Sequence, residues 1–293
     1  MSHFSVLVIG ENVEAQLQPY HEFECTGTDD RFVQDIDVTD ECREHGLDWH
    51  GLEEKTVTDE AQIDREDVHK YGYAVVDAEG KLIKAINRTN PNKTWDWWVV
   101  GGRWSGFLKL KPGAAGALGR KGLMGSCANE GPGHADEALK RDVDFPGMRD
   151  AAGEKAGAEW DRAAAALAAA GAPSTWTSWE QMRDVEHKGD IDAARQAYHA
   201  QPSVKAIKGA FDSFWCEADS YMVSRDVFVQ QARDRACVPY AFVKDGQWFG
   251  KGEMGWFGMS RGDAPQEEWN AKFNELLDSL PDDTRLTVVD CHI

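Results

Sequence analysis

The sequence predicts an α+β protein whose mainly antiparallel sheet contains both terminal strands and whose middle is a helical insertion. Three observations lead to this prediction. The chain begins and ends with apolar runs typical of strands, two alternating segments have the pattern of β-hairpins, and a long alanine-rich stretch lies between them. The order of these elements also permits two variants, a ferredoxin-like arrangement and a duplicated sheet unit.

The terminal strands are predicted at residues 3–9 (HFSVLVI) and 285–293 (RLTVVDCHI). Continuous apolar runs are expected for strands that are covered on both faces. The first run lacks a preceding basic segment, so we interpret it as a strand and not as a signal peptide. Asn12 is expected to cap a short helix that stops at Pro19, and residues 21–25 (HEFEC) are expected to form another strand.

Two hairpins are predicted, at residues 71–86 and 238–252, because each has alternating runs around an acidic residue and a glycine. Their first strands align as YAVV at 73–76 and YAFV at 240–243. This similarity is the basis for the duplicated variant.

The middle of the chain is predicted to be helical. Residues 151–171 combine a high alanine content with a glycine stop, and Thr177 and Glu180 have the spacing of a capping box. Helical periodicity continues near 189–200, 203–214 and 225–236, and again after Pro265 over 267–280. We therefore divide the chain into a discontinuous α+β sheet domain (1–111 and 237–293), a Gly/Pro-rich irregular connection (112–150) and a helical insertion (151–236).

The charge balance limits the classes of partner. The chain of 293 residues has 51 acidic and 32 basic residues, which gives a formal net charge of −19. Such a charge repels nucleic-acid phosphates and anionic membranes and favours a partner with a basic surface. No apolar run has the roughly 18–20 residues of a membrane span. The six cysteines lack CxxC spacing, so we expect reduced thiols in a cytoplasmic protein, whose oligomeric state the sequence leaves open.

A tryptophan-rich segment, NPNKTWDWWVVGGRWSGFLKL, is the most unusual stretch. In an extended run Trp95 and Trp97 would share one face and Trp98 the other, as in the covered interior of a sheet. A functional interpretation depends on Arg103, which follows two glycines and precedes Trp104. An arginine among aromatic rings can stack on them or bind a carboxylate or phosphate.

Several long motifs resemble an uncharacterised protein family encoded by tailed bacteriophages and prophages. They are MSHFSVLVIG, HEFECTG, WDWWVVGGRWSGFLKLKPG, HKGD, KGEMGWFGM and LPDDTRLTVVDCHI, so the resemblance extends from end to end. The family pattern is WDWYxxGGRW, and Trp98 stands at the tyrosine position. The resemblance implies a phage accessory protein in the bacterial host cytoplasm, and it implies no activity.

Our first functional hypothesis is a non-catalytic accessory protein that binds and modulates a host protein, such as a defence component. The acidity and the absence of any complete catalytic or cofactor motif in the sequence favour it. Since tryptophan and arginine dominate interface hot spots, the expected binding residues are Trp95, Trp97, Trp98, Arg103, Trp104 and Trp256. No cofactor is expected under this hypothesis.

The alternative hypothesis is a metal-dependent hydrolase that acts on a nucleotide or phosphodiester. In the last strand Asp290 and His292 point to one side, and in HEFEC Glu22 and Glu24 share a face. If these two strands are neighbours, the four side chains form an oxygen- and nitrogen-rich site for a divalent metal. Arg103 would then bind the phosphate.

Two further sites are considered from the cysteines. His21, Cys25 and Cys291 are a softer set that suits zinc under the same strand pairing. Cys127 with His134 in the Gly-rich connection has the residue types of an activated thiol, although nothing in the sequence orients the base.

Overall fold

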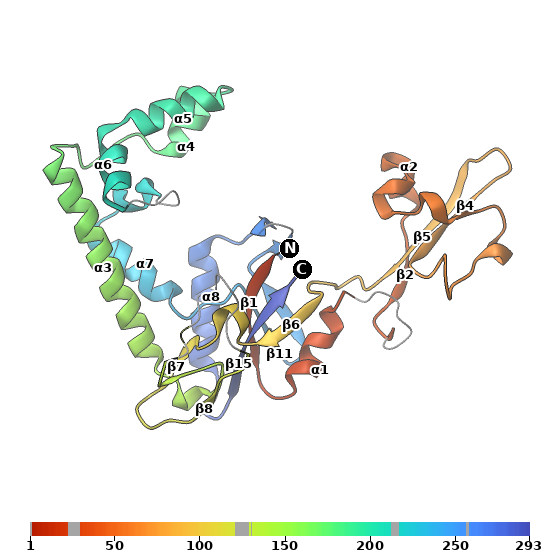
Figure 1. Cartoon of the computed structure of the whole chain (residues 1–293), viewed down its shortest axis with the longest axis horizontal. Helices are drawn as coiled ribbons and strands as arrows, with labels where there is room; N and C mark the ends of the chain where they lie inside the picture. Colours follow the sequence, from red (N-terminus) through yellow and green to blue (C-terminus); the bar gives the residue numbers. More distant parts are fainter. Residues whose placement is uncertain (1, 23–29, 121–128, 130, 212–216, 256–257) are drawn as a thin grey trace. The chain divides into compact units, whose positions relative to one another are not determined.

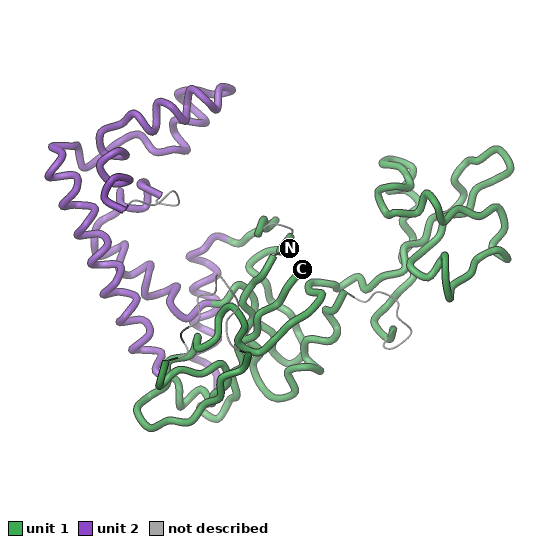
Figure 2. Tube along the Cα trace, in the orientation of Figure 1, with its two compact units in different colours: residues 1–143, 239–264, 281–293 green, residues 144–238, 265–280 purple. Residues whose placement is uncertain are grey.

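The computed structural model describes residues 2–22, 30–120, 129, 131–211, 217–255 and 258–293. The chain forms two compact units (Figure 2). Unit 1 comprises residues 1–143, 239–264 and 281–293, and unit 2 comprises 144–238 and 265–280. The sequence-based division differs, since it placed 237–238 and 265–280 with the sheet and treated 112–150 as a separate connection. Residues 112–143 belong to unit 1 and 144–150 to unit 2.

Unit 1 is built on a mixed sheet that has seven strands within the described ranges (Figure 1). The order is β12-β11-β1-β15-β10-β8, and β6 also pairs with β15. The bounds are β1 His3–Ile9, β6 Trp97–Val100, β8 Gly116–Ala117, β10 Glu137–Leu139, β11 Ala241–Lys244, β12 Gln247–Gly250 and β15 Arg285–His292. The α+β prediction is confirmed, with both terminal strands in one sheet.

The terminal strands lie at the centre of this sheet, and nearly every residue of both strands is buried. β1 and β15 run antiparallel, with His3 opposite His292 and Ile9 opposite Leu286. One face carries a core cluster to which these strands contribute Phe4, Val6, Val8, Val289 and Cys291. The backbone N–H of Ser2 donates to the carbonyl of Ile293 at 2.8 Å, so both chain ends lie at the same end of the sheet.

The strand order differs from the ferredoxin-like variant. In that arrangement the second strand of the hairpin lies beside the first strand of the chain. Here β11, the first strand of its hairpin, lies beside β1 and runs parallel to it. The two hairpins considered as a duplication also lie in different sheets, because β4 (Gly72–Val76) and β5 (Leu82–Thr89) belong to a second sheet.

This second sheet has the order β2-β5-β4-β3, with β2 at Gln34–Asp37 and β3 at Thr56–Val57. Two small apolar clusters surround it, and Val38 and Cys42 from the start of α2 (Thr39–His45) belong to one of them. No strand was predicted from the sequence between residues 26 and 69. The strand β2 could not be predicted, because it is mostly exposed and lacks an apolar pattern.

Part of the Gly/Pro-rich connection also forms strands. β10 adds to the main sheet beside β15, and β8 pairs with β10. A separate pair joins β7 (Leu108–Lys109) and β9 (His134–Ala135). Two further short strands in unit 1, β13 (Glu253–Met254) and β14 (Ser260–Arg261), pair with each other.

Unit 2 contains the helices α3 Phe145–Ala169, α4 Trp179–Gln181, α5 Ile191–Ala200, α6 Pro202–Phe211, α7 Arg225–Arg235 and α8 Gln266–Ser279. Its apolar cluster includes Ala163, Tyr198 and Ile207. The expected capping box at Thr177 is displaced by one residue, since Ser178 caps α4 by accepting from the N–H of Gln181. Besides α2, unit 1 holds the short helix α1 (Val13–Leu17), where Asn12 makes no side-chain cap.

A search of the described helices for a membrane-spanning segment finds none with the required length and apolar character.

Candidate functional site

Two histidines face each other at the end of the main sheet where the chain termini meet. His3 and His292 are direct partners across β1 and β15, so their side chains lie on the same face. Their ring centroids are 4.8 Å apart at an interplanar angle of 74°. The sequence prediction included His292 and missed His3, whose significance depends on the pairing of the two chain ends.

Each histidine is held by a carboxylate at Nδ1. The Nδ1 of His3 donates to Oδ1 of Asp290 at 2.8 Å, and the Nδ1 of His292 donates to Oδ1 of Asp96 at 2.7 Å. A carboxylate only accepts, so both rings carry a proton on Nδ1. Within the described part of the chain no hydrogen bond reaches either Nε2 atom. Both nitrogens thus keep an unused hydrogen-bonding position, in side chains that are 9 % (His3) and 5 % (His292) exposed.

Asp290 is fully buried and its second oxygen is also used. Oδ2 accepts the backbone N–H of Arg103 at 2.9 Å. The neighbouring Gly102 has φ 57°, and a Cβ there would lie 2.5 Å from Oδ2 of Asp290. Only glycine allows this close approach of backbone to carboxylate. The glycine pair in the tryptophan segment thus has a definite role, which is to place the chain against Asp290.

Trp97 forms a wall of the histidine pair. Its ring stacks on His292 at a centroid distance of 5.0 Å and an angle of 17°, and it meets the edge of His3 at 5.3 Å. The backbone N–H of Asp96 donates to the carbonyl of His292 at 2.9 Å. The side chain of Asp96 is 40 % exposed whereas that of His292 is 5 % exposed, so this carboxylate faces the solvent side of the cluster.

A second buried carboxylate, Asp136, lies on the other side of the glycine pair and was not singled out from the sequence. Its oxygens accept the backbone N–H groups of Gly106 at 2.5 Å and Gly119 at 2.7 Å, and the hydroxyl of Ser105 at 3.3 Å. Burial raises the pKa of Asp136 above its ordinary value, and the hydrogen bonds oppose this rise. A Cβ at Gly101 would lie 2.4 Å from Oδ2 of Asp136.

The tryptophans of the segment have different environments. Trp95 is buried in the core cluster and its Nε1 donates to the carbonyl of Leu17 at 3.2 Å, while Trp98 packs against the same cluster. Trp97 and Trp104 are half-buried. The expected alternation fails before β6, since Trp95 lies on the face of Trp98 and not on that of Trp97. Trp256 lies outside the described residues.

Arg103 contributes an unpaired polar atom. Its side chain is half-buried, and its Nε is buried with no hydrogen-bond partner among the described residues. No salt bridge from its guanidinium is present among the described side chains. A buried donor without a partner is costly, which makes this side chain a candidate for binding an anion.

The residues of the metal hypothesis have separate partners. Glu22 forms an ion pair with Lys93 at 3.0 Å, whereas Asp290 and His292 are engaged in the two dyads. Glu24 lies outside the described residues. A search of the described side chains finds no group of three or more His, Cys, Asp or Glu placed to hold a metal ion.

The described members of the two cysteine-based sites have other partners or environments. His21 stacks on Trp95, and its Nε2 meets the carbonyl oxygen of Asp96 at 2.9 Å. Cys291 lies in the core cluster, where burial raises the pKa of its thiol well above the usual value. Cys25 and Cys127 lie outside the described residues. The Nε2 of His134 is bonded to the side-chain amide of Asn129 at 2.8 Å.

Comparison with known proteins adds no relative. No protein-family model matches the chain, and no significant match is found among curated proteins or solved structures.

Proposed function

We propose that His3 and His292 form the acid–base centre of a hydrolase that acts on a nucleotide or another small phosphodiester. The observation that carries this proposal is the pair of carboxylate–imidazole dyads with neighbouring rings. A carboxylate on Nδ1 fixes the orientation of the ring and stabilises the imidazolium that forms when Nε2 takes a proton. Two such rings in one site can exchange protons with one substrate.

The chemistry requires two opposite protonation states. One neutral imidazole accepts the proton of the attacking water or hydroxyl at Nε2 while the new P–O bond forms. The other, protonated at Nε2, donates its proton to the leaving oxygen as the old P–O bond breaks. No electron transfer and no further reactant are needed, and the two rings end with their protonation states exchanged.

The neighbouring residues favour a phosphoryl substrate. Arg103 follows the glycine that contacts Asp290, and its guanidinium suits a phosphate oxygen. The described cysteines Cys42, Cys237 and Cys291 are buried, and the pKa of each thiol is raised by burial, so they are poor nucleophiles for acyl transfer. The charge of −19 favours a small substrate over a nucleic-acid polymer.

A metal-dependent version of the same proposal remains testable. Histidines that bind a metal through one nitrogen commonly donate the other to a carboxylate, as both rings do here. Catalytic zinc sites use three protein ligands, however, and the described residues bring only two imidazoles together. Metal-free acid–base chemistry therefore fits the donor set better.

The experiment measures hydrolysis of bis(p-nitrophenyl) phosphate and of 2′,3′-cyclic nucleotides, with and without a chelator. His3→Gln and His292→Gln are each expected to lower kcat by about 10²- to 10⁴-fold. His134→Gln, which removes a histidine bonded elsewhere, is the matched control. Circular dichroism of each variant tests whether it is folded.

Two results would overturn the proposal. One is wild-type turnover no greater than that of the double variant His3→Gln/His292→Gln on every substrate. The other is equal activity of the folded single variants and the wild type. Loss of activity with the chelator, and recovery with one divalent metal, would replace the metal-free mechanism by the metal-dependent one.

We also propose a second function, binding to a host protein by a phage-encoded accessory factor. Besides the phage-like motifs, the distribution of exposed apolar side chains favours it. Trp49, Val68, Tyr71 and Ile83 are exposed in the part of unit 1 that contains the second sheet. Pull-down from a bacterial lysate, repeated with Trp49→Ala and at high salt, tests it. Capture that is indifferent to both changes would contradict this function.

A further inference from the structure

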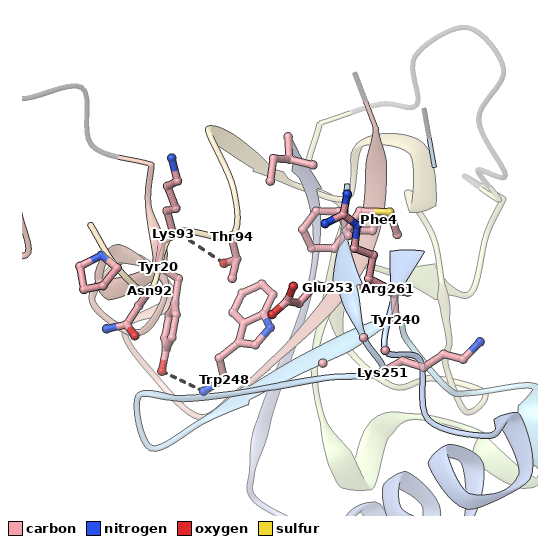
Figure 3. A pocket seen from close by; sticks show the side chains of 16 residues that line it. Phe4, Tyr20, Asn92, Lys93, Thr94, Tyr240, Trp248, Lys251, Glu253 and Arg261 are labelled. Carbon is pink, nitrogen blue, oxygen red and sulfur yellow. Dashed lines mark hydrogen bonds between the residues drawn. The ribbon is translucent and has the colours of Figure 1, made fainter. Parts of the chain in front are cut away.

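A pocket of about 880 Å³ lies in unit 1 beside the main sheet (Figure 3). Phe4 and Ile293 line it, and they alternate along their strands with His3 and His292. Its volume is within the range of about 300–1,000 Å³ that is typical of small-molecule sites. The pocket and the histidine pair are therefore separate candidate sites.

The wall of the pocket is aromatic. Phe4 meets the edges of Tyr240 and Trp248, with ring centroids 5.5 and 6.3 Å apart, and Tyr20 lies 5.3 Å from Trp248. The hydroxyl of Tyr20 accepts the backbone N–H of Trp248 at 2.9 Å and donates to the carbonyl of Gly246 at 3.0 Å. These contacts hold the rings in place, so a planar ligand would meet a preformed surface.

The charged side chains at the pocket are mainly basic, in a chain that is strongly acidic overall. Lys93, Lys251 and Arg261 line it, with Glu253 as the acidic member (Figure 3). Lys93 pairs with Glu22 and Lys251 pairs with Asp263 at 3.4 Å. Glu253 is opposite Arg261 across the β13–β14 pair, yet no salt bridge joins these two described side chains. The carboxylates of Glu22, Asp263 and Glu253 balance the three cations in number. Arg261 is the lining cation without an ion pair among the described side chains, so its guanidinium is the group that can bind an anion.

The hydroxyl of Tyr240 is the strongest indication of a ligand. It is buried and makes no well-formed hydrogen bond with the described residues. The side chain of Ser260 lies near enough to oppose the rise of its pKa but does not complete a hydrogen bond of normal geometry. Burial raises the pKa of Tyr240 to about 12, so the hydroxyl remains a donor at neutral pH. A buried donor without an acceptor costs about 1–3 kcal/mol, and a ligand oxygen at this wall would remove that cost.

We propose that this pocket binds a nucleoside monophosphate, with the base against the aromatic wall and the phosphate near Lys251 and Arg261. The hydroxyl of Tyr240 donates to an oxygen of the ligand. Planar rings stack on aromatic side chains at about 1–3 kcal/mol per base, and the cations bind the phosphate. This site is independent of the proposed hydrolysis because it uses none of the residues of the two dyads.

Calorimetric titration with AMP, adenosine and inorganic phosphate tests the proposal. The wild type is expected to bind AMP at least about tenfold more tightly than either fragment, since the two halves of the site act together. Tyr240→Phe is expected to weaken AMP binding about tenfold, because it removes one buried hydrogen bond. It should change Tm little, because the hydroxyl makes no well-formed hydrogen bond with the described residues of the free protein.

Matched variants separate the contribution of the phosphate contact from that of the base contact. Arg261→Ala is expected to weaken AMP binding and leave adenosine binding unchanged, while Lys155→Ala, an exposed lysine on α3, serves as the charge control. His3→Gln should leave AMP affinity unchanged, which distinguishes failure of this proposal from failure of the hydrolase. Absence of AMP binding at millimolar concentration, or equal affinity for AMP and phosphate, would overturn the proposal.

Discussion

The glycine pair before Arg103 is the residue-scale feature on which the candidate site depends most. Gly101 and Gly102 have φ of 81° and 57°, and each lies against a different buried carboxylate, Asp136 and Asp290 respectively. A side chain at either position would have to displace an aspartate that is held by several hydrogen bonds. The glycine pair therefore allows the backbone of the tryptophan segment to pack directly against Asp136 and Asp290.

The first prediction concerns Gly102→Ala. A Cβ 2.5 Å from Asp290, added to an unfavourable positive φ, is expected to lower the free energy of unfolding by about 2–4 kcal/mol. Gly113→Ala is the matched control, since Gly113 has φ 78° with open space around it and should lose only about 1 kcal/mol. Urea denaturation measures both values. Equal losses would contradict the proposed contact with Asp290.

The second prediction uses the raised pKa of Asp136. Because the folded chain binds this proton more tightly than the unfolded chain, stability falls as pH rises from the ordinary pKa of 3.8 to the raised one, and is constant above it. Asp136→Asn cannot titrate. It should be less stable by about 1–3 kcal/mol, because its amide NH₂ must face a backbone N–H.

The difference between the wild type and Asp136→Asn should therefore shrink as pH rises through that window. Denaturation at several pH values measures it, with Asp282→Asn, an exposed aspartate, as the control for the rest of the chain. If the stability difference between the two proteins instead grows with pH, the folded state favours the charged form of Asp136 and the raised pKa is contradicted.

At the scale of elements, the strands that could be predicted from the sequence are those with long apolar runs. β1 and β15 were predicted because each run is apolar and covered on both faces. The strands β8, β9 and β10 were not predicted, because two or three residues are too few to show the alternation of apolar and polar side chains that marks a strand. The side of the hairpin that faces β1 was also beyond prediction, since both orders have the same local pattern.

The candidate site was predictable only in part for a similar reason. Asp290, His292 and Arg103 stand in motifs that are visible in the sequence. His3 joins them through the register of β1 and β15, and a shift of one residue would place it on the other face. Trp95 was assigned to the wrong face because the chain bends before β6 begins at Trp97.

The third prediction concerns the helices of unit 2, which are linked by Asp219. Its carboxylate accepts the Nε1 of Trp176 at 2.8 Å, the backbone N–H of Trp179 at 2.7 Å and the hydroxyl of Tyr198 at 2.7 Å. Asp219→Ala leaves three donors without an acceptor, so a loss of about 3–5 kcal/mol is expected. Tryptophan fluorescence during urea denaturation measures it.

Asp192→Ala is the control for this prediction. Asp192 forms an ion pair with Arg195 in which both side chains are largely exposed, and such pairs contribute about 0–1 kcal/mol. A loss at Asp219 no larger than at Asp192 would mean that the three hydrogen bonds do not stabilise the helices.

At the scale of the whole molecule, the net charge sets the response to salt. With 51 acidic and 32 basic residues, like charges repel over about 30 Å at an ionic strength of about 0.01 M and over about 8 Å at 0.15 M. Exposed ion pairs such as Lys84 with Glu60 and Arg225 with Asp161 are also screened by salt, but each contributes little. We therefore expect added salt to stabilise the protein, because the repulsion that it screens outweighs the ion pairs that it weakens.

Tm is accordingly expected to rise by about 2–4 °C for each kcal/mol of repulsion that is screened as NaCl increases from about 10 to about 200 mM. Differential scanning calorimetry measures the shift. Glu53→Gln/Glu54→Gln, which removes two exposed negative charges, should show a smaller rise because less repulsion remains to be screened. A Tm that falls with added salt would mean that attractive pairs outweigh the net charge, and that the acidity is balanced within the fold.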